Sequence, residues 1–321
     1  MIRAPFPWFG GKALAADLIW SRFGSDIGTF VEPFAGSCAV ALNRPESFVG
    51  WITLNDLDGL ICNFWRSMML NPAEVAAAAC SPVNECDLHA RHLWLVNNKE
   101  RLTARLMADP DYCEPLAAGW WAWGCCSWIG GGWCAGDGPW KAVPGEDGIP
   151  ELRKVGNNGQ GVNRKLPHLG DNGRGVNRRE DWLNEWFAEL SELLHNARMA
   201  CGSWERVCSP GTITRNGAAG VLLDPPYSLT GAVYAEDSST VSGDVREWCK
   251  ANGDNKNIRI ALCGHSGEGH EELETLGWDC VEWDKGGGYQ GADDRERIWF
   301  SPYCLGQSMG GLFGFADEVA A

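Results

Sequence analysis

The stretch from residue 28 to residue 56 constrains the fold of this chain more than any other part of the sequence. Residues 28–32 (GTFVE) are predicted to form a short buried strand, and the small-residue turn Phe34-Ala35-Gly36-Ser37 that follows leads into a helical stretch. A second strand is predicted at 51–55 (WITLN), and it ends in Asp56. The order strand, glycine turn, helix, strand, acid is typical of a nucleotide-binding α/β unit. We therefore predict an α/β fold.

The same alternation of strands and helices returns in the last third of the chain. Short apolar runs predict strands at 219–224, 258–263, 279–283 and 297–301, with helices at 244–252 and 270–276 between them. The simplest architecture is one α/β domain built from both ends of the chain, residues 1–70 and 196–305. An inserted region at 71–195 interrupts it, and a tail at 306–321 follows it.

The inserted region is predicted to be mostly helix and loop. Before it, residues 57–70 (LDGLICNFWRSMML) of the α/β domain have the apolar spacing of a buried helix. The inserted region then opens with a new helix at Asn71-Pro72, with Asn71 as its cap. Residues 71–112 look helical, whereas 113–180 are rich in Gly, Trp and Asn with little periodicity. An amphipathic helix begins at Asp181, with an apolar face made of Trp182, Leu183, Trp186, Phe187, Leu190, Leu193 and Leu194.

Charge is distributed unevenly along the chain. The net charge of −15 argues against a protein that coats nucleic acid nonspecifically, because phosphate contacts need Lys and Arg. Residues 151–180, however, hold seven basic and three acidic side chains. Within them, 156–164 recurs fourteen residues later as 170–178. Two explanations stay open for this repeat: paired loops that each present an Arg and an Asn, or a flexible Gly-rich linker.

Composition excludes several other classes of protein. A chain of 321 residues with 45% hydrophobic content can bury a large core without help from disulfides or metals. Its fourteen cysteines are scattered and no export signal precedes them, so we expect reduced thiols in the cytoplasm. Cys125, Cys126 and Cys134 lack paired two-residue spacing and a fourth ligand, so we expect no metal site. The chain also has no apolar run long enough for a membrane span, so we expect no membrane association.

The tetrad Asp224-Pro225-Pro226-Tyr227 carries the clearest chemical signal. It follows a strongly apolar strand, so it lies at the carboxyl end of the sheet, where open α/β folds bind ligands. A carboxylate and a backbone carbonyl there can accept the two N–H groups of an exocyclic amine and direct its lone pair at an incoming group. Tyr227 offers a ring for stacking on a base taken out of a duplex. The alternative explanation is a plain strand-ending turn, because Asp and Pro are common turn residues.

Four segments together resemble the Dam-like, D12-class family of N6-adenine DNA methyltransferases. They are Trp8-Phe9-Gly10-Gly11-Lys12, Val31-Glu32-Pro33-Phe34-Ala35-Gly36-Ser37, Leu54-Asn55-Asp56 and Asp224-Pro225-Pro226-Tyr227. The similarity covers about residues 5–70 and 195–305, and the order of the motifs is that of the subclass with cofactor motifs first, target recognition next and the catalytic tetrad last. The chain departs from the family at Cys38, where a second glycine is usual.

The resemblance implies a Rossmann-like, S-adenosylmethionine-dependent methyltransferase fold and direct methyl transfer to adenine N6. It implies catalytic roles for Asp224, Pro225, Pro226 and Tyr227. It further implies cofactor contacts from Trp8, Lys12, Phe34, Gly36, Ser37, Asp56 and Asp224. A P-loop role for Lys12 is excluded, because Phe6 stands where the first glycine would be and Ala13 follows the lysine.

Double-stranded DNA is the expected partner, and no obligatory protein partner is evident. The candidates for DNA contact in the basic segment are Arg164, Lys165, Arg174, Arg178, Asn163 and Asn177. Two alternatives remain: the same fold methylating cytosine N4 or an amine in RNA, and an inactive DNA-binding homologue. A cytosine C5 methyltransferase is excluded, because the chain has no Pro-Cys dipeptide for the nucleophile that such enzymes use.

Overall fold

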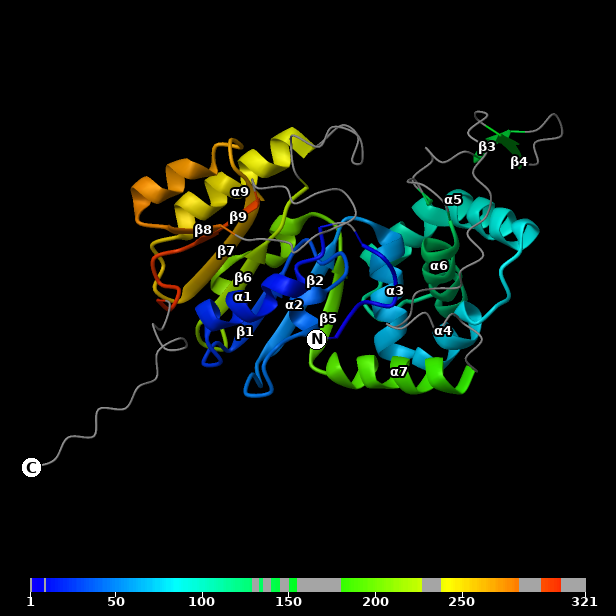
Figure 1. The fold of residues 1–321 in the computed structure, drawn as a ribbon, viewed down its shortest axis with the longest axis horizontal. Coiled ribbons are helices and arrows are strands. Elements are labelled where there is room, and N and C mark those ends of the chain that lie inside the picture. Colours follow the sequence, from blue (N-terminus) through cyan, green and yellow to red (C-terminus); the bar gives the residue numbers. More distant parts are fainter. Residues whose placement is uncertain are drawn as a thin grey trace, which may run out of the picture.

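A seven-stranded sheet with helices on both faces forms the centre of the molecule (Figure 1). The computed structural model describes residues 2–8, 10–128, 133–134, 140–144, 150–154, 180–226, 238–282 and 296–306. The strands of the sheet are β1 (Thr29–Glu32), β2 (Trp51–Asp56), β5 (Ala197–Cys201), β6 (Ala219–Leu223), β7 (Ile258–His265), β8 (Asp279–Glu282) and β9 (Glu296–Phe300). The strands, which alternate with helices along the chain, form one mixed sheet, and the predicted α/β class is confirmed.

The order of the strands places the ends of several of them at one edge. Across the sheet the order is β5-β2-β1-β6-β7-β9-β8. The first five strands in this order run parallel to their neighbours, whereas β9 runs antiparallel to both β7 and β8. The carboxyl ends of β2, β1, β6 and β7 therefore meet at one edge. Because β9 is reversed, its first residue, Glu296, lies at the same edge, opposite His265 in the register.

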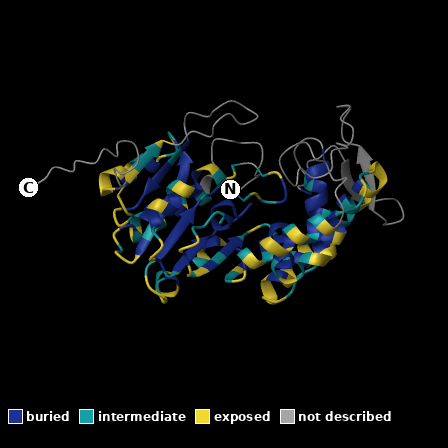
Figure 2. Ribbon diagram, turned by 60° about the horizontal axis from the view of Figure 1, so that its bottom comes forward, coloured by how far each residue is buried: buried dark blue, intermediate teal, exposed yellow. Residues whose placement is uncertain are grey.

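Both faces of the sheet are buried, as the apolar strands predict. Leu222 of β6 faces a hydrophobic cluster that includes α1 (Ala16–Phe23) and α3 (Gly59–Leu70). Its neighbours Val221 and Leu223 face a second cluster, formed with α9 (Ser238–Asn252) and the 3-10 helices η2 (Trp204–Val207) and η3 (His270–Leu276). Figure 2 shows the strands buried and the outer faces of the helices exposed. The result is a three-layer arrangement of helices, sheet and helices.

A helical region continues the first of these clusters beyond the sheet. It contains α4 (Pro72–Ala79), α5 (Glu85–Ala108), α6 (Pro115–Ser127) and α7 (Glu180–Leu193), which gather beside α3 in Figure 1. The remaining elements are η1 (Ala13–Ala15), α2 (Ala39–Leu42), α8 (Pro210–Ile213) and a two-stranded antiparallel ribbon of β3 (Trp140–Pro144) and β4 (Pro150–Lys154). Among the helices that the structure describes, none combines the length and apolarity needed to cross a membrane.

Two polar side chains of α3 connect this region to the sheet. Asn63 accepts a hydrogen bond from the backbone N–H of Glu114 at 2.7 Å and donates one to its carbonyl oxygen at 2.9 Å. The guanidinium of Arg66, buried in the interior, donates to the carbonyl oxygens of Leu106, Asp109, Tyr112 and Met199 at 2.8 to 3.2 Å. These bonds satisfy backbone groups in the last turn of α5, in the segment between α5 and α6, and on the edge strand β5.

Several local features differ from the sequence prediction. Helix α6 was expected to be irregular, but it is apolar all round and so has no amphipathic period to detect. Strand β5 was not expected, because only part of it is buried. Asn71 occupies the cap position of α4, but its side-chain amide donates to Cys113 Sγ at 3.3 Å and does not cap the helix. The helix expected at 270–276 is the 3-10 helix η3.

Candidate active site at the carboxyl edge of the sheet

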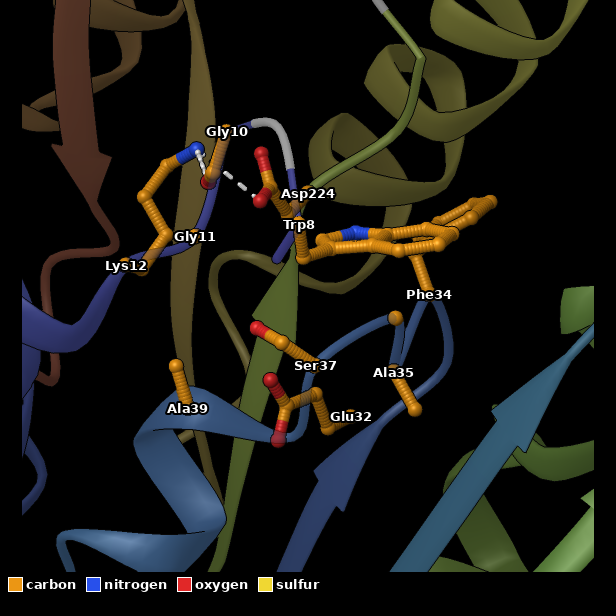
Figure 3. A pocket seen from close by; sticks show the side chains of 11 residues that line it. Trp8, Gly10, Gly11, Lys12, Glu32, Phe34, Ala35, Ser37, Ala39 and Asp224 are labelled. Carbon is orange, nitrogen blue, oxygen red and sulfur yellow. Dashed lines mark hydrogen bonds and ion pairs between the residues drawn. The ribbon is translucent and has the colours of Figure 1, made fainter. Parts of the chain in front are cut away.

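A pocket of about 240 Å³ opens at the edge where the carboxyl ends of the central strands meet. It is lined by Trp8, Gly10, Gly11, Lys12, Glu32, Phe34, Ala35, Gly36, Ser37, Ala39 and Asp224. Figure 3 shows the side chains of Lys12, Asp224, Ser37 and Glu32 around one space, with the rings of Trp8 and Phe34 to one side of it. The pocket thus joins the N-terminal segment to the end of β6, although these lie far apart in the sequence.

The glycine turn after β1 is held by contacts that only glycine permits. Gly36 has φ +44°, and a Cβ on it would overlap the indole of Trp8. Its carbonyl oxygen accepts a hydrogen bond from Trp65 Nε1 at 2.8 Å, and its N–H donates to Asp56 Oδ2 at 3.0 Å. Trp8 therefore lies directly on the turn, and the bare backbone of Gly36 forms part of the pocket wall.

Asp56 lies behind this turn and is not among the residues that line the pocket. Its second oxygen, Oδ1, accepts from the backbone N–H of Asp58 at 2.9 Å. Burial raises the pKa of Asp56 to about 6, although the N–H donors of Asp58 and Gly36 oppose the shift. The carboxylate thus fixes the turn and carries an unusually high pKa. Its predicted contact with the ribose of a cofactor stays a prediction.

Cys38 occupies a position where the family usually has glycine. The backbone conformation at Cys38 explains why glycine suits this position. Its φ of 52° and ψ of 29° lie in the left-handed region, which glycine adopts without a steric cost. The side chain is fully buried at the start of α2, and burial raises the pKa of its thiol well above the usual value. The chain therefore keeps the backbone shape of a glycine while burying a thiol.

Lys12 is the cation of the site, and it is almost completely buried at 3% exposure. Its Nζ donates to Asp224 Oδ2 at 2.9 Å and to the carbonyl oxygen of Gly10 at 2.9 Å, and lies 3.5 Å from Glu296 Oε1 (Figure 3 shows the first two contacts). Burial lowers the pKa of this ammonium, but the neighbouring carboxylates, Asp224 above all, outweigh burial and raise it overall. Lys12 is therefore charged.

Two carboxyl groups at this edge, those of Glu32 and Glu296, were not predicted as site residues from the sequence. Glu32 lines the pocket at 5% exposure, and burial raises its pKa well above the usual value. Its Oε2 has no hydrogen-bond partner among the described residues. Its position as the last residue of β1, like Asp56 at the end of β2, could have revealed it. Glu296 could not be found this way, because the antiparallel direction of β9 is a property of the tertiary structure.

The electrostatics of the edge favour a cationic ligand. Four carboxyl groups gather there, those of Asp56, Glu32, Asp224 and Glu296, and Lys12 is the one ammonium between two of them. Glu32 accepts a hydrogen bond from the backbone of Ala41, but its buried Oε2 has no partner among the described residues, and a ligand that brings a donor would satisfy it. Within the described residues, no group of three or more His, Cys, Asp or Glu side chains is arranged to hold a metal ion.

Part of the predicted site lies outside the described residues. Pro225 is buried and Pro226 is half-buried directly after β6, with Asp224 21% exposed toward the pocket. Tyr227 falls outside the described ranges, as do all six candidates for DNA contact: Asn163, Arg164, Lys165, Arg174, Asn177 and Arg178. The structure thus describes the cofactor half of the prediction and the first three residues of the tetrad.

Comparison with known proteins agrees with the resemblance seen in the sequence. The model of the D12 class N6 adenine-specific DNA methyltransferase family matches residues 8–100. No curated protein matches the chain. The matched stretch contains Trp8, Lys12, the glycine turn and Asp56, which form or support the pocket wall. Over residues 8–100, this chain is therefore similar to the D12 class N6 adenine-specific DNA methyltransferases, which confirms the family that its motifs indicated.

Proposed function

We propose that this protein transfers a methyl group from S-adenosylmethionine to N6 of an adenine flipped out of double-stranded DNA. The observation that carries the proposal is the common pocket of two distant segments. Asp224 of the tetrad lines the same space as Trp8, Gly36 and Ser37 of the family-matched stretch. A plain strand-ending turn would give no reason for Asp224 to form an ion pair with the buried Lys12 inside that space.

The residues of the pocket fit such a cofactor. S-adenosylmethionine, when bound, supplies an electrophilic methyl group on a positively charged sulfonium. The unpartnered Glu32 Oε2 and the net negative edge suit its cationic groups, and the bare backbone of Gly36 allows close approach. Among the described residues, the lining of the pocket comes only from parts of 8–12 and 32–39 and from Asp224, which surround one small open space. We therefore assign the pocket to part of the cofactor, with Trp8, Phe34 and Ser37 beside it.

The catalytic work of the chain is to orient an amine. The carboxylate of Asp224 and the carbonyl of Pro225 would accept the two N–H groups of adenine N6, which directs the nitrogen lone pair toward the methyl group. Lys12 holds Asp224 Oδ2, so the carboxylate has a defined orientation before the base arrives. Because the sulfonium becomes a neutral thioether, little new charge develops, and positioning supplies most of the rate enhancement.

An adenine inside a duplex cannot reach this pocket, so the base must leave the helix. Asp224 is exposed toward the pocket only in part, which suits a single extruded base better than an open surface. In this proposal Tyr227 stacks on the extruded base, and the basic segment at 151–180 contacts the duplex, with Arg and Lys on phosphates or guanines and Asn on adenines.

Incubation with isotope-labelled S-adenosylmethionine and mixed-sequence duplex DNA, followed by nucleoside mass spectrometry, tests the proposal. The expected product is N6-methyl-deoxyadenosine. Asp224→Asn removes the charge of the acceptor and should abolish transfer while the cofactor still binds. The matched control is Asp254→Asn, the same change at an exposed position of the loop before β7, which should leave the rate unchanged.

Other outcomes would replace the proposal with one of its alternatives. N4-methyl-deoxycytidine as product would assign the same fold to cytosine. Methylated RNA in a parallel reaction would change the substrate class. Bound DNA with no product under any condition would identify a binding protein without transferase activity.

A further inference from the structure

Among the described residues around the pocket, Glu296 is the most deeply buried acidic side chain, and neither the sequence motifs nor the family match assigned it a role. It is 1% exposed, against 21% for Asp224, and lies outside residues 8–100. It reaches the site only because β9 runs antiparallel to β7, which places Glu296 beside His265 at the carboxyl edge. A buried carboxylate is costly unless it is paired, so its partner indicates its role.

Lys12 is one partner of the Glu296 carboxylate. The ammonium of Lys12 has three N–H groups. Two of them are used at 2.9 Å, one by Asp224 Oδ2 and one by the carbonyl oxygen of Gly10. Glu296 Oε1 lies 3.5 Å from the same nitrogen. Lys12 is thus held between a carboxylate that opens to the pocket and one that is closed off from it.

The balance of charge around Lys12 decides how available Asp224 is. If Asp224 were the sole counter-ion of a buried ammonium, the pair would draw together and the carboxylate would be a weaker acceptor for an amine N–H. A second carboxylate on the opposite side shares the positive charge. Among the described residues, other ionisable groups whose charge acts on Lys12 are Cys263 of β7, fully buried, and Glu32 of β1, whose raised pKa favours its neutral form. Glu296 is therefore the group that can share the charge.

We propose that Glu296 is a positioning residue that acts through Lys12: it fixes the ammonium against Asp224 and balances its charge, so that Asp224 remains a strong acceptor for the amine of the substrate. This role rests on the proposed function of Asp224. The contact between Glu296 and Lys12 itself does not depend on that function and can be measured separately.

The principal variant is Glu296→Gln, which keeps the size of the side chain and removes its charge. We expect kcat for methyl transfer to fall by about tenfold to a hundredfold, by analogy with the outer-shell groups that orient metal ligands. The affinity for S-adenosylmethionine, measured by calorimetry, should change by less than about threefold, because Glu296 does not line the pocket. Glu296→Asp retains the charge and should recover part of kcat. The matched control is Glu282→Gln on β8, whose carboxylate is 78% exposed and paired with Arg297, and it should behave as the wild type.

A double-variant cycle separates this role from a structural one. In a Lys12→Met background, adding Glu296→Gln should cost no further activity, because the group through which Glu296 acts is already gone. Additive losses, or a fall in cofactor affinity equal to the fall in kcat, would overturn the proposal. If Glu296→Gln does not fold, Glu296→Asp and the charge-neutral double variant still provide the comparison.

A readout without turnover keeps this inference distinct from the proposed function. In protein labelled with ¹³C at lysine Cε and ¹⁵N at Nζ, the Lys12 signal is identified by its loss in Lys12→Met. Glu296→Gln should lower the pKa of Lys12 relative to wild type, whereas Glu282→Gln should not. An unchanged titration of Lys12 would refute the charge-sharing role even if the wild type methylates DNA. A lowered pKa in a protein without methyltransferase activity would keep the ion-pair network and reject the proposed function.

Discussion

The left-handed backbone at Cys38 makes an unusual prediction about stability. At an ordinary helical position, replacing Ala by Gly costs about 0.5–1 kcal/mol, because Gly loses more conformational freedom on folding. At Cys38, with φ 52° and ψ 29°, any residue with a Cβ carries a steric cost of roughly 1–2 kcal/mol that Gly avoids. The two terms have opposite signs. We therefore expect Cys38→Gly to be at least as stable as Cys38→Ala, with a difference of about 0–1.5 kcal/mol.

Both variants lose the same buried Sγ, and Cys38→Gly additionally loses the buried Cβ, so any stability that it keeps relative to Cys38→Ala comes from the relieved backbone. The free energies of unfolding should be measured by urea denaturation for the wild type and both variants. Ala41→Gly in α2, a buried position of ordinary helical geometry, is the control and should be less stable than wild type by at least about 1 kcal/mol. If Cys38→Ala proved more stable than Cys38→Gly by about 1 kcal/mol, as at an ordinary helical position, the left-handed strain assigned to this turn would be refuted.

Three further predictions concern buried charges. Burial raises the pKa of Asp56 from 3.8 to about 6, so the contribution of Asp56 to folding stability is fully present below pH 3.8 and is lost as the pH rises through 6. The affinity for S-adenosylmethionine should instead weaken as the pH falls from 7 to 5, because Asp56 becomes protonated. If an Asp56→Asn variant kept this pH dependence in calorimetry, Asp56 would be excluded as its source. Arg66→Leu leaves four carbonyl oxygens without their donor at about 1–3 kcal/mol each, so urea denaturation should show a loss of at least about 3 kcal/mol, against almost none for Arg198→Leu on the exposed side of β5. Glu32→Gln mimics the protonated carboxyl that burial favours, so the free energy of unfolding at pH 7 should not fall, and a large loss would show that Glu32 is ionised in the free protein.

The pocket shows how a single Lys can connect two motifs. Lys12 leaves the N-terminal segment and contacts Asp224 at the end of β6 and Glu296 at the start of β9. Its interactions therefore depend on the order of the strands, with β6 next to β1 and β9 next to β7. A change that shifts any of these strands would alter the orientation of Asp224. The stability of the sheet and the geometry of the site are thus coupled through one ammonium group.

Some features could be read from local patterns alone. Strands β6 and β7 are largely apolar and β1 and β2 contain shorter apolar runs, and residues placed directly after such strands, such as the Gly36 turn and Asp224, lie at the carboxyl edge of the sheet. The periodicity of α7 predicted its buried face correctly, since Leu183, Phe187 and Leu190 are almost fully buried. These predictions succeed because the interactions that decide them lie within a few residues of one another.

The sequence by itself therefore determined the α/β class, the positions of most strands, and the identity of Lys12, Gly36 and Asp224 as candidate site residues. Only the tertiary structure decided that Lys12 lies between two carboxylates, that Asp56 supports the glycine turn from behind, and that Glu296 belongs to the site. The physical reason is that each of these depends on strand order and direction. Both are set by packing between segments far apart in the chain, and no local pattern records them.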